Sequence, residues 1–152
     1  RELDIYINLF VISSKINCPN FLSKQQLRDI SLSSYVNIQS HTHTHRRLNL
    51  LSHEDLILEL KKSKELLEDI VTQEVDSLCF PEGRYNSHVV NVAFECDYTK
   101  LYSSLPGFSD NLSTNKIIRR SLVQHSSKSE FKSILSGGDN FLYHWYKLQH
   151  KS

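Results

Sequence analysis

Apolar segments recur along the chain at lengths typical of buried β-strands. Residues 5–12 (IYINLFVI) are almost continuously apolar and rich in β-branched and aromatic side chains. Such a run is typical of a strand buried on both faces of a parallel sheet. Shorter segments of similar character follow at 35–40, 76–80, 101–105 and 117–123. The pattern therefore predicts several short strands separated by other elements.

The segments between these strands have helical spacing. Ser23 is a candidate N-cap for a helix over 24–32, and Ser52 with Asp55 resembles a capping box that opens a longer helix to about residue 72. In this longer helix we expect one side to face the core (Leu56, Leu60, Ser63, Leu67 and Ile70) and the charged side to face water (Glu59, Lys61, Lys62, Lys64, Glu65, Glu68 and Asp69).

Three further helices are expected in the second half of the chain. Ser87 is a candidate cap for a helix that runs to residue 94, and the others cover 129–135 and 141–148. Strands and helices thus alternate, which predicts an α/β fold built from parallel βαβ units. The length of 152 residues suits a single domain.

Composition narrows the classes of function. Eighteen basic and seventeen acidic residues leave a net charge of +1, so nothing suggests the positive field that sequence-independent nucleic-acid binding needs. No apolar run reaches the length of about 18 residues that spans a bilayer, and no signal peptide is visible. The three cysteines fit neither a disulfide framework nor a CxxC clip. Because the chain begins at Arg1 and contains no Met, we expect it to be a piece of a longer reading frame.

One dense cluster of chemically active side chains stands directly after the strand at 35–40. It reads Ser40-His-Thr-His-Thr-His45 and places three imidazoles at alternate positions. Ligand sites in α/β folds lie at the carboxyl ends of strands, and imidazole suits Zn²⁺ and related metals. A polar surface turn is the alternative, and the HxH pattern alone is shared by unrelated metal enzymes.

The flanks of this cluster resemble the polysaccharide deacetylases with a NodB-like domain. The motif His-Ser/Thr-x-x-His is matched by 41–45, a Leu-rich turn by 48–52, and the later Pro-x-Gly loop by 80–86. The resemblance implies a distorted (β/α) barrel, incomplete at its N-terminus. The motif Thr-Phe-Asp-Asp, which supplies a third ligand and the base in the family, has no match, so residues 1–152 are expected to form one such domain without its first strand and first catalytic motif.

The resemblance also implies roles for individual residues. His41 and His45 would bind Zn²⁺ or another divalent metal, and Thr42 would support the site. His43 would point elsewhere, or would contact the ligands without binding the metal itself. The backbone of the loop Pro81, Glu82 and Gly83 would face the developing oxyanion, although Cys79 replaces the usual Arg and Glu82 the usual aromatic residue.

Less specific matches lie later in the chain. His125, in Val-Gln-His, has the letters of the family's general-acid motif, and Arg120 and Tyr85 are candidates for substrate binding. Tyr143, Trp145 and Tyr146 are suited either to stacking on sugars or to packing of a terminal helix.

The implied function is metal-dependent hydrolysis that removes N- or O-linked acetyl groups from a glycan. In the N-linked case it is a hydrolysis of carbon-nitrogen bonds other than peptide bonds. Since the Thr-Phe-Asp-Asp motif is unmatched, residues 1–152 alone are expected to hydrolyse the substrate slowly or not at all. Two alternatives stay open: an inactive glycan-binding or structural remnant of the same fold, and a metal-binding protein that uses His41, His43 and His45 together.

Overall fold

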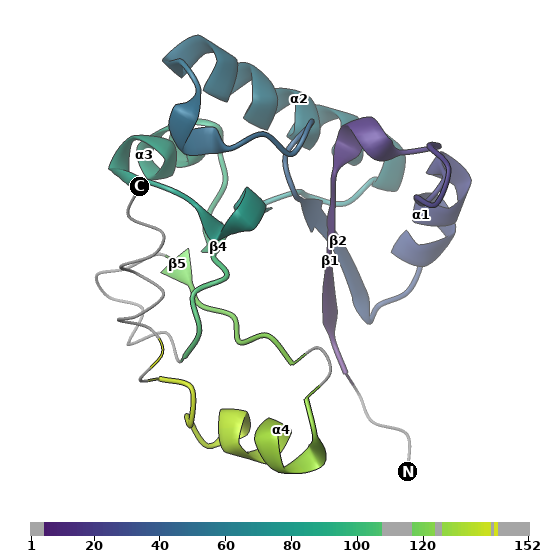
Figure 1. The fold of residues 1–152 in the computed structure, drawn as a ribbon. Helices are drawn as coiled ribbons and strands as arrows, with labels where there is room; N and C mark the ends of the chain where they lie inside the picture. Colours follow the sequence, from purple (N-terminus) through teal and green to yellow (C-terminus); the bar gives the residue numbers. More distant parts are fainter. Residues whose placement is uncertain (1–4, 108–116, 124–125, 141, 143–152) are drawn as a thin grey trace.

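The chain folds around one five-stranded parallel sheet with the strand order β1-β2-β3-β4-β5 (Figure 1). The computed structural model describes residues 5–107, 117–123, 126–140 and 142. The strands are β1 (Ile7–Val11), β2 (Val36–Ser40), β3 (Ser77–Cys79), β4 (Lys100–Tyr102) and β5 (Ile117–Ile118). All neighbouring pairs are parallel, so the predicted α/β fold is confirmed. Within the described residues the sheet stays open, since β1 and β5 are its two edges.

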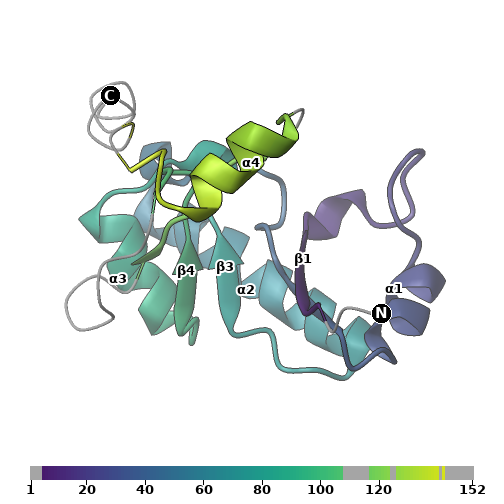
Figure 2. The ribbon, with the colours of Figure 1, turned by 90° about the horizontal axis from the view of Figure 1, so that it is seen from below.

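The described residues also form four α-helices and three short 3₁₀ turns, of which α4 follows the last strand and the others lie between strands. The helices are α1 (Lys24–Ser31), α2 (His53–Val71), α3 (Ser87–Glu95) and α4 (Lys128–Leu135). The turns are η1 (Ser13–Lys15), η2 (Leu48–Leu50) and η3 (Pro81–Gly83). Helix α4 lies apart from α1 and α2 in both views of the ribbon (Figures 1 and 2). None of the described helices is long and apolar enough to cross a membrane.

Side-chain caps set the starts of the helices, and two of them differ from the prediction. Ser23 and Ser52 cap α1 and α2 as expected, through the N–H groups of Gln26 and Asp55. Helix α3 is capped by Asn86, with the predicted cap Ser87 as its first helical residue. The Asn86 amide oxygen accepts from the backbone three residues on, which is as favourable as a serine cap. In α4 the cap is Ser127, two residues before the expected start.

The strands are shorter than the apolar runs that predicted them. Strand β4 ends at Tyr102 and β5 at Ile118, and beyond them the two segments are joined by the bonds from Ser103 N–H to the Ile118 carbonyl and from Arg120 N–H to the Leu105 carbonyl. Strand β1 was expected to be buried on both faces, but Ile7 is 52% exposed. As an edge strand it pairs only with β2 among the described residues. The helix predicted over 141–148 lies outside the described residues, apart from residue 142.

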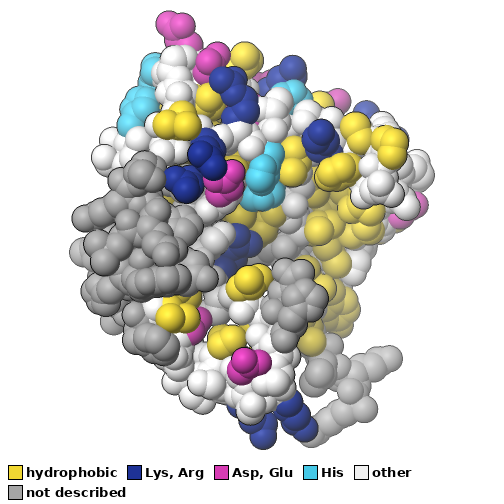
Figure 3. All heavy atoms as spheres, in the orientation of Figure 1, with side chains coloured by type: hydrophobic (Ala, Val, Ile, Leu, Met, Phe, Trp, Pro, Cys, Tyr) yellow, Lys and Arg dark blue, Asp and Glu magenta, His cyan; other side chains and the backbone are white. Residues whose placement is uncertain are grey.

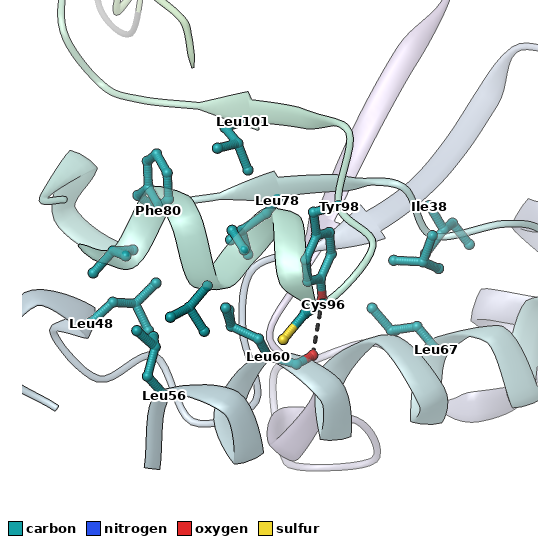
Figure 4. Close-up of a cluster of buried hydrophobic side chains, with 14 of the residues drawn as sticks. Ile38, Leu48, Leu56, Leu60, Leu67, Leu78, Phe80, Cys96, Tyr98 and Leu101 are labelled. Carbon is teal, nitrogen blue, oxygen red and sulfur yellow. Dashed lines mark hydrogen bonds between the residues drawn. The ribbon is translucent and has the colours of Figure 1, made fainter. Parts of the chain in front are cut away.

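The hydrophobic core lies between the sheet and helices α1 to α3 (Figure 4). Leu60 on α2, Leu78 on β3 and Leu101 on β4 are fully buried there. Tyr98 is also buried, and its hydroxyl donates to the Leu60 carbonyl at 3.0 Å. Burial raises the pKa of Tyr98, so the phenol stays a donor. This core holds the carboxyl ends of β2 and β3 side by side, where the histidine cluster begins.

Candidate active site

The loop at 41–45 leaves β2 at the carboxyl edge of the sheet and is fixed there by backbone hydrogen bonds. His41 N–H donates to the Val11 carbonyl at 2.9 Å, and the carbonyls of Thr42 and His43 accept from Ser13 and Ser14. The loop therefore continues the β1–β2 pairing beyond the ends of both strands. Its conformation is set by the neighbouring strand and not by the loop sequence alone.

Thr42 makes the sharp turn that brings the outer histidines together. It is fully buried and has φ of 67°, a left-handed conformation that β-branched residues seldom adopt. Two hydrogen bonds hold it there: its N–H donates to Ser40 Oγ, and its Oγ1 accepts from His45 N–H, both at 3.1 Å. The rings of His41 and His45, on either side of this turn, lie edge to face with centroids 4.7 Å apart.

His41 is held in one tautomer. Its Nδ1 lies 2.8 Å from the Cys79 carbonyl, which can only accept, so the proton is assigned to Nδ1 and the Nε2 lone pair is left available. Burial lowers the pKa of His41, against the effect of this hydrogen bond, and the charges of His45 and Arg120 lower it further. A neutral imidazole whose other nitrogen donates to a carbonyl is the usual state of a metal-binding histidine.

His43 turns away from this pair. Its Nδ1 lies 2.8 Å from Ser13 Oγ, at the start of η1. Burial and the nearby Lys62 lower the pKa of His43, against the effect of Glu59. The three histidines therefore divide into a facing pair, His41 and His45, and a separate member with its own partner.

Glu59 on α2 is hydrogen-bonded to the histidine loop, although the helical pattern predicts it on the solvated side of the helix. It is only 5% exposed. Its carboxylate accepts the Thr44 N–H and the Thr44 hydroxyl, the latter at 2.9 Å to Oε2. Glu59 stands three residues after Leu56 and four before Ser63, on the same side of the helix as these buried residues. This spacing is the feature of the sequence that could have predicted its burial.

Replacing Glu59 by alanine is expected to lower the free energy of unfolding by about 1.5–3 kcal/mol, the range for hydrogen bonds to a charged group. The matched control is Glu65→Ala, at an exposed position of the same helix, which should change stability by less than about 0.5 kcal/mol. Urea unfolding of the two variants measures both values. Equal losses in the two variants would show that the contact with Thr44 adds no stability.

The loop Pro81–Gly83 follows β3 and forms the turn η3 beside the histidines. Glu82 and Gly83 both have positive φ, at 55° and 69°. A Cβ added at Gly83 would lie 2.8 Å from the backbone nitrogen of Ser104, so the turn requires glycine there. Pro81 has no N–H, and the Gly83 N–H already donates to the Phe80 carbonyl at 3.0 Å. Of the three residues, Glu82 is therefore the one whose N–H is the candidate donor to a substrate.

The Glu82 side chain connects this loop to the histidine loop. Its Oε2 lies 2.8 Å from Arg47 Nε and 3.3 Å from Arg84 Nε. Since Glu82 and Arg47 are about half exposed, these ion pairs add little stability. They place a carboxylate between two guanidinium groups, and Figure 3 shows histidine, acidic and basic side chains gathered on this face.

Arg120 is anchored inside the fold and does not extend freely into solvent. Its Nε donates to the Ser103 carbonyl at 3.0 Å, its Nη2 lies 2.9 Å from Cys79 Sγ, and its guanidinium lies 5.4 Å from the centroid of the Phe10 ring. Burial raises the pKa of the Cys79 thiol, although Arg120 acts in the opposite direction. Thus a guanidinium from the segment after β5 reaches Cys79, the position at which the family motif predicts an arginine.

Of the remaining residues predicted for the site, the structure describes only Tyr85. Tyr85 is half-buried and stacks on Phe80, with ring centroids 4.9 Å apart, so part of its ring is used in packing. Its role in substrate binding stays a prediction. His125 and the aromatic residues at 143, 145 and 146 lie outside the described residues.

The donors of the site fit part of a metal-binding set. His41 and His45 face each other, and His41 is neutral with its Nε2 available. Across the described ranges, no three His, Cys, Asp or Glu side chains come close enough to hold an ion together. His41 and His45 are imidazoles of the kind that zinc accepts, and the described residues place no third such donor beside them.

Comparisons with known proteins identify the family of the chain. The family model described as polysaccharide deacetylase matches residues 1–101, about two thirds of the chain. The chain belongs to the polysaccharide deacetylase family, which confirms the resemblance predicted from its motifs. A curated relative, the putative polysaccharide deacetylase YxkH of Bacillus subtilis (strain 168), is 27% identical over 107 residues, or 70% of this chain and 38% of YxkH.

Solved structures share the fold. The polysaccharide deacetylase BC0361 from Bacillus cereus superposes with a TM-score of 0.77 at 24% identity, covering 86% of this chain and 42% of that one. The Streptococcus pyogenes deacetylase PplD, solved in complex with acetate, gives a TM-score of 0.78 at 20% identity, covering 86% and 59%. The chain thus spans about 40–60% of these relatives.

Proposed function

We propose that this chain forms part of a metal-dependent hydrolase that removes acetyl groups from a polysaccharide. The observation that carries the proposal is the facing pair of His41 and His45, with the His41 tautomer fixed by the Cys79 carbonyl so that its Nε2 is available. Membership of the polysaccharide deacetylase family supports the substrate class. The sugar and the linkage of the acetyl group, N or O, are left open.

In the proposed site, His41 and His45 would hold Zn²⁺ or another divalent cation. When bound, such an ion polarises a carbonyl oxygen and makes a bound water more acidic. The chain's own contribution is to keep both imidazoles on one side of the loop, through the Thr42 turn and its support by Glu59. The carboxylates that would complete the ligand set and take the proton from water are not among the described residues gathered here.

The Glu82 N–H would stabilise the negative charge that develops on the acetyl oxygen. The positive φ values of Glu82 and Gly83 fix the orientation of the peptide groups in this turn before substrate binds. A fixed donor of this kind contributes roughly 3 kcal/mol of transition-state stabilisation in other hydrolases. The ion pairs of Glu82 with Arg47 and Arg84 would surround the turn with charged groups beside the histidine loop.

The proposal is tested by acetate release in the protein with its native flanking sequence. N-acetylated and O-acetylated oligosaccharides are the substrates, and we expect release that stops with a chelator and returns with added Zn²⁺. Saccharide binding without acetate release, after reconstitution with several divalent metals, would contradict hydrolysis and favour the inactive remnant.

A further inference from the structure

A pocket lies where β1 and β2 begin, at the opposite end of these strands from the histidines, which follow the carboxyl end of β2. It has a volume of about 370 Å³ and is lined chiefly by Tyr6, Asn8, Tyr35, Asn37 and Gln73. Strand β2 separates Tyr35 from His41 by six residues, or about 20 Å at the rise of an extended strand. The pocket is therefore distinct from the candidate active site.

The lining of this pocket combines aromatic rings with amides and hydroxyls. None of the described residues that form it is acidic or basic. The rings of Tyr6 and Tyr35 lie 5.5 Å apart, and the two residues are 76% and 44% exposed. Exposed aromatic faces beside groups that both donate and accept hydrogen bonds suit a ligand with apolar C–H faces and many hydroxyls. An uncharged sugar has this chemistry.

The side-chain amide of Gln73 uses only one of its two ends in hydrogen bonds within the described part of the chain. Gln73 Nε2 donates to the Ser31 carbonyl at 2.9 Å, which fixes the side chain. Its Oε1 is buried and has no hydrogen-bond partner within the part of the chain that the structure describes. A buried acceptor left unpaired is costly, and a ligand hydroxyl would satisfy it.

The pocket is held in shape before any ligand binds. Ile7 N–H donates to the Tyr35 carbonyl at 2.8 Å, so the two tyrosines stay at adjacent positions of paired strands. Asn37 Nδ2 donates to Asn8 Oδ1 at 3.2 Å, across a pair of residues that are in register in the sheet. Because these contacts fix the lining, little ordering is required on binding.

We propose that the pocket between the starts of β1 and β2 is a binding site for an uncharged saccharide unit, separate from the histidine site. Tyr6 and Tyr35 supply the stacking surface, and Gln73 accepts from a sugar hydroxyl. The site does not depend on the proposed hydrolysis, since it shares no residue with it. In a polymeric substrate it would bind sugar units distant from the one that reacts.

The test is a titration of the protein with chitotetraose and with cellotetraose, both uncharged, followed by calorimetry in the presence of a chelator. We expect the protein to bind at least one of the two saccharides. Tyr6→Ala or Tyr35→Ala should lower this affinity about tenfold, whereas Tyr6→Phe should keep the affinity of the parent. Since the lining is uncharged, raising the salt from about 50 to about 500 mM should change the affinity less than about twofold.

Two control variants distinguish this pocket from saccharide binding elsewhere on the protein. Phe21→Ala removes an aromatic ring that is 49% exposed but does not line the pocket, and it should bind like the parent. Phe131→Ala, on α4, removes a ring that is 42% exposed and also lies outside the pocket lining, and it should bind like the parent. Failure of both saccharides to bind at millimolar concentration, or a loss in Phe21→Ala or Phe131→Ala equal to that in the tyrosine variants, would overturn the proposal.

Discussion

Replacing His41 by alanine is expected to lower the zinc affinity of the protein by about 100-fold or more. Mutating only the hydrogen-bond partner of a metal ligand already costs about 10–100-fold in metal affinity. His41 combines the features of a strong ligand: its Nδ1 donates to the Cys79 carbonyl at 2.8 Å, and burial keeps the ring neutral. Competition against a zinc-binding dye at pH 7 measures the affinity. His45→Ala should give a loss of similar size, because the two rings face each other.

The matched control is His43→Ala, which removes the histidine between them. His43 contacts Ser13 and not the facing pair, so its loss should change zinc affinity by less than about threefold. If all three substitutions weaken binding equally, the three histidines act together. That outcome would favour a metal-binding cluster over the two-histidine site of a deacetylase.

Replacing Phe80 by alanine is expected to lower the free energy of unfolding by about 3–5 kcal/mol. Phe80 is fully buried, stacks on Tyr85, and directly precedes Pro81, so its loss leaves a cavity beneath the η3 turn. Because the Phe80 carbonyl also accepts the Gly83 N–H, the turn should loosen as the core opens. Urea unfolding followed by circular dichroism measures the change.

The same chemical change at an exposed position provides the control. Phe21 is 49% exposed, so Phe21→Ala should cost less than about 1 kcal/mol. A loss for Phe80→Ala no greater than that for Phe21→Ala would mean that the packing between η3 and the core is not as described. It would also remove the physical basis for a fixed turn beside the histidines.

Features that depend on local pattern were predicted well from the sequence. The leucine stripe of α2 and the serine caps at Ser23 and Ser52 depend on residues three to seven positions apart, and the structure confirms them. The alternation of strands and helices likewise predicted the parallel sheet. The histidines stand at the carboxyl edge because they directly follow β2.

Features that depend on contacts distant in sequence could not be predicted in the same way. The side chain of Glu59 is buried because Thr44, fifteen residues earlier, donates to it, and nothing in the helical pattern indicates that partner. Strand β1 has an apolar sequence but lies at an edge of the described sheet, so composition alone overestimated its burial. The pocket between Tyr6 and Tyr35 exists only through the register of β1 against β2.

The proposed metal site requires that His41 and His45 share one cation while His43 does not. This requirement is tested most directly by NMR of the histidine ring nitrogens during a titration with Zn²⁺. We expect the Nε2 resonance of His41 and one ring nitrogen of His45 to shift together and to reach their limits at one equivalent, with His43 unchanged. A shift of His43 at the same equivalence, or independent titration of His41 and His45, would contradict the shared site.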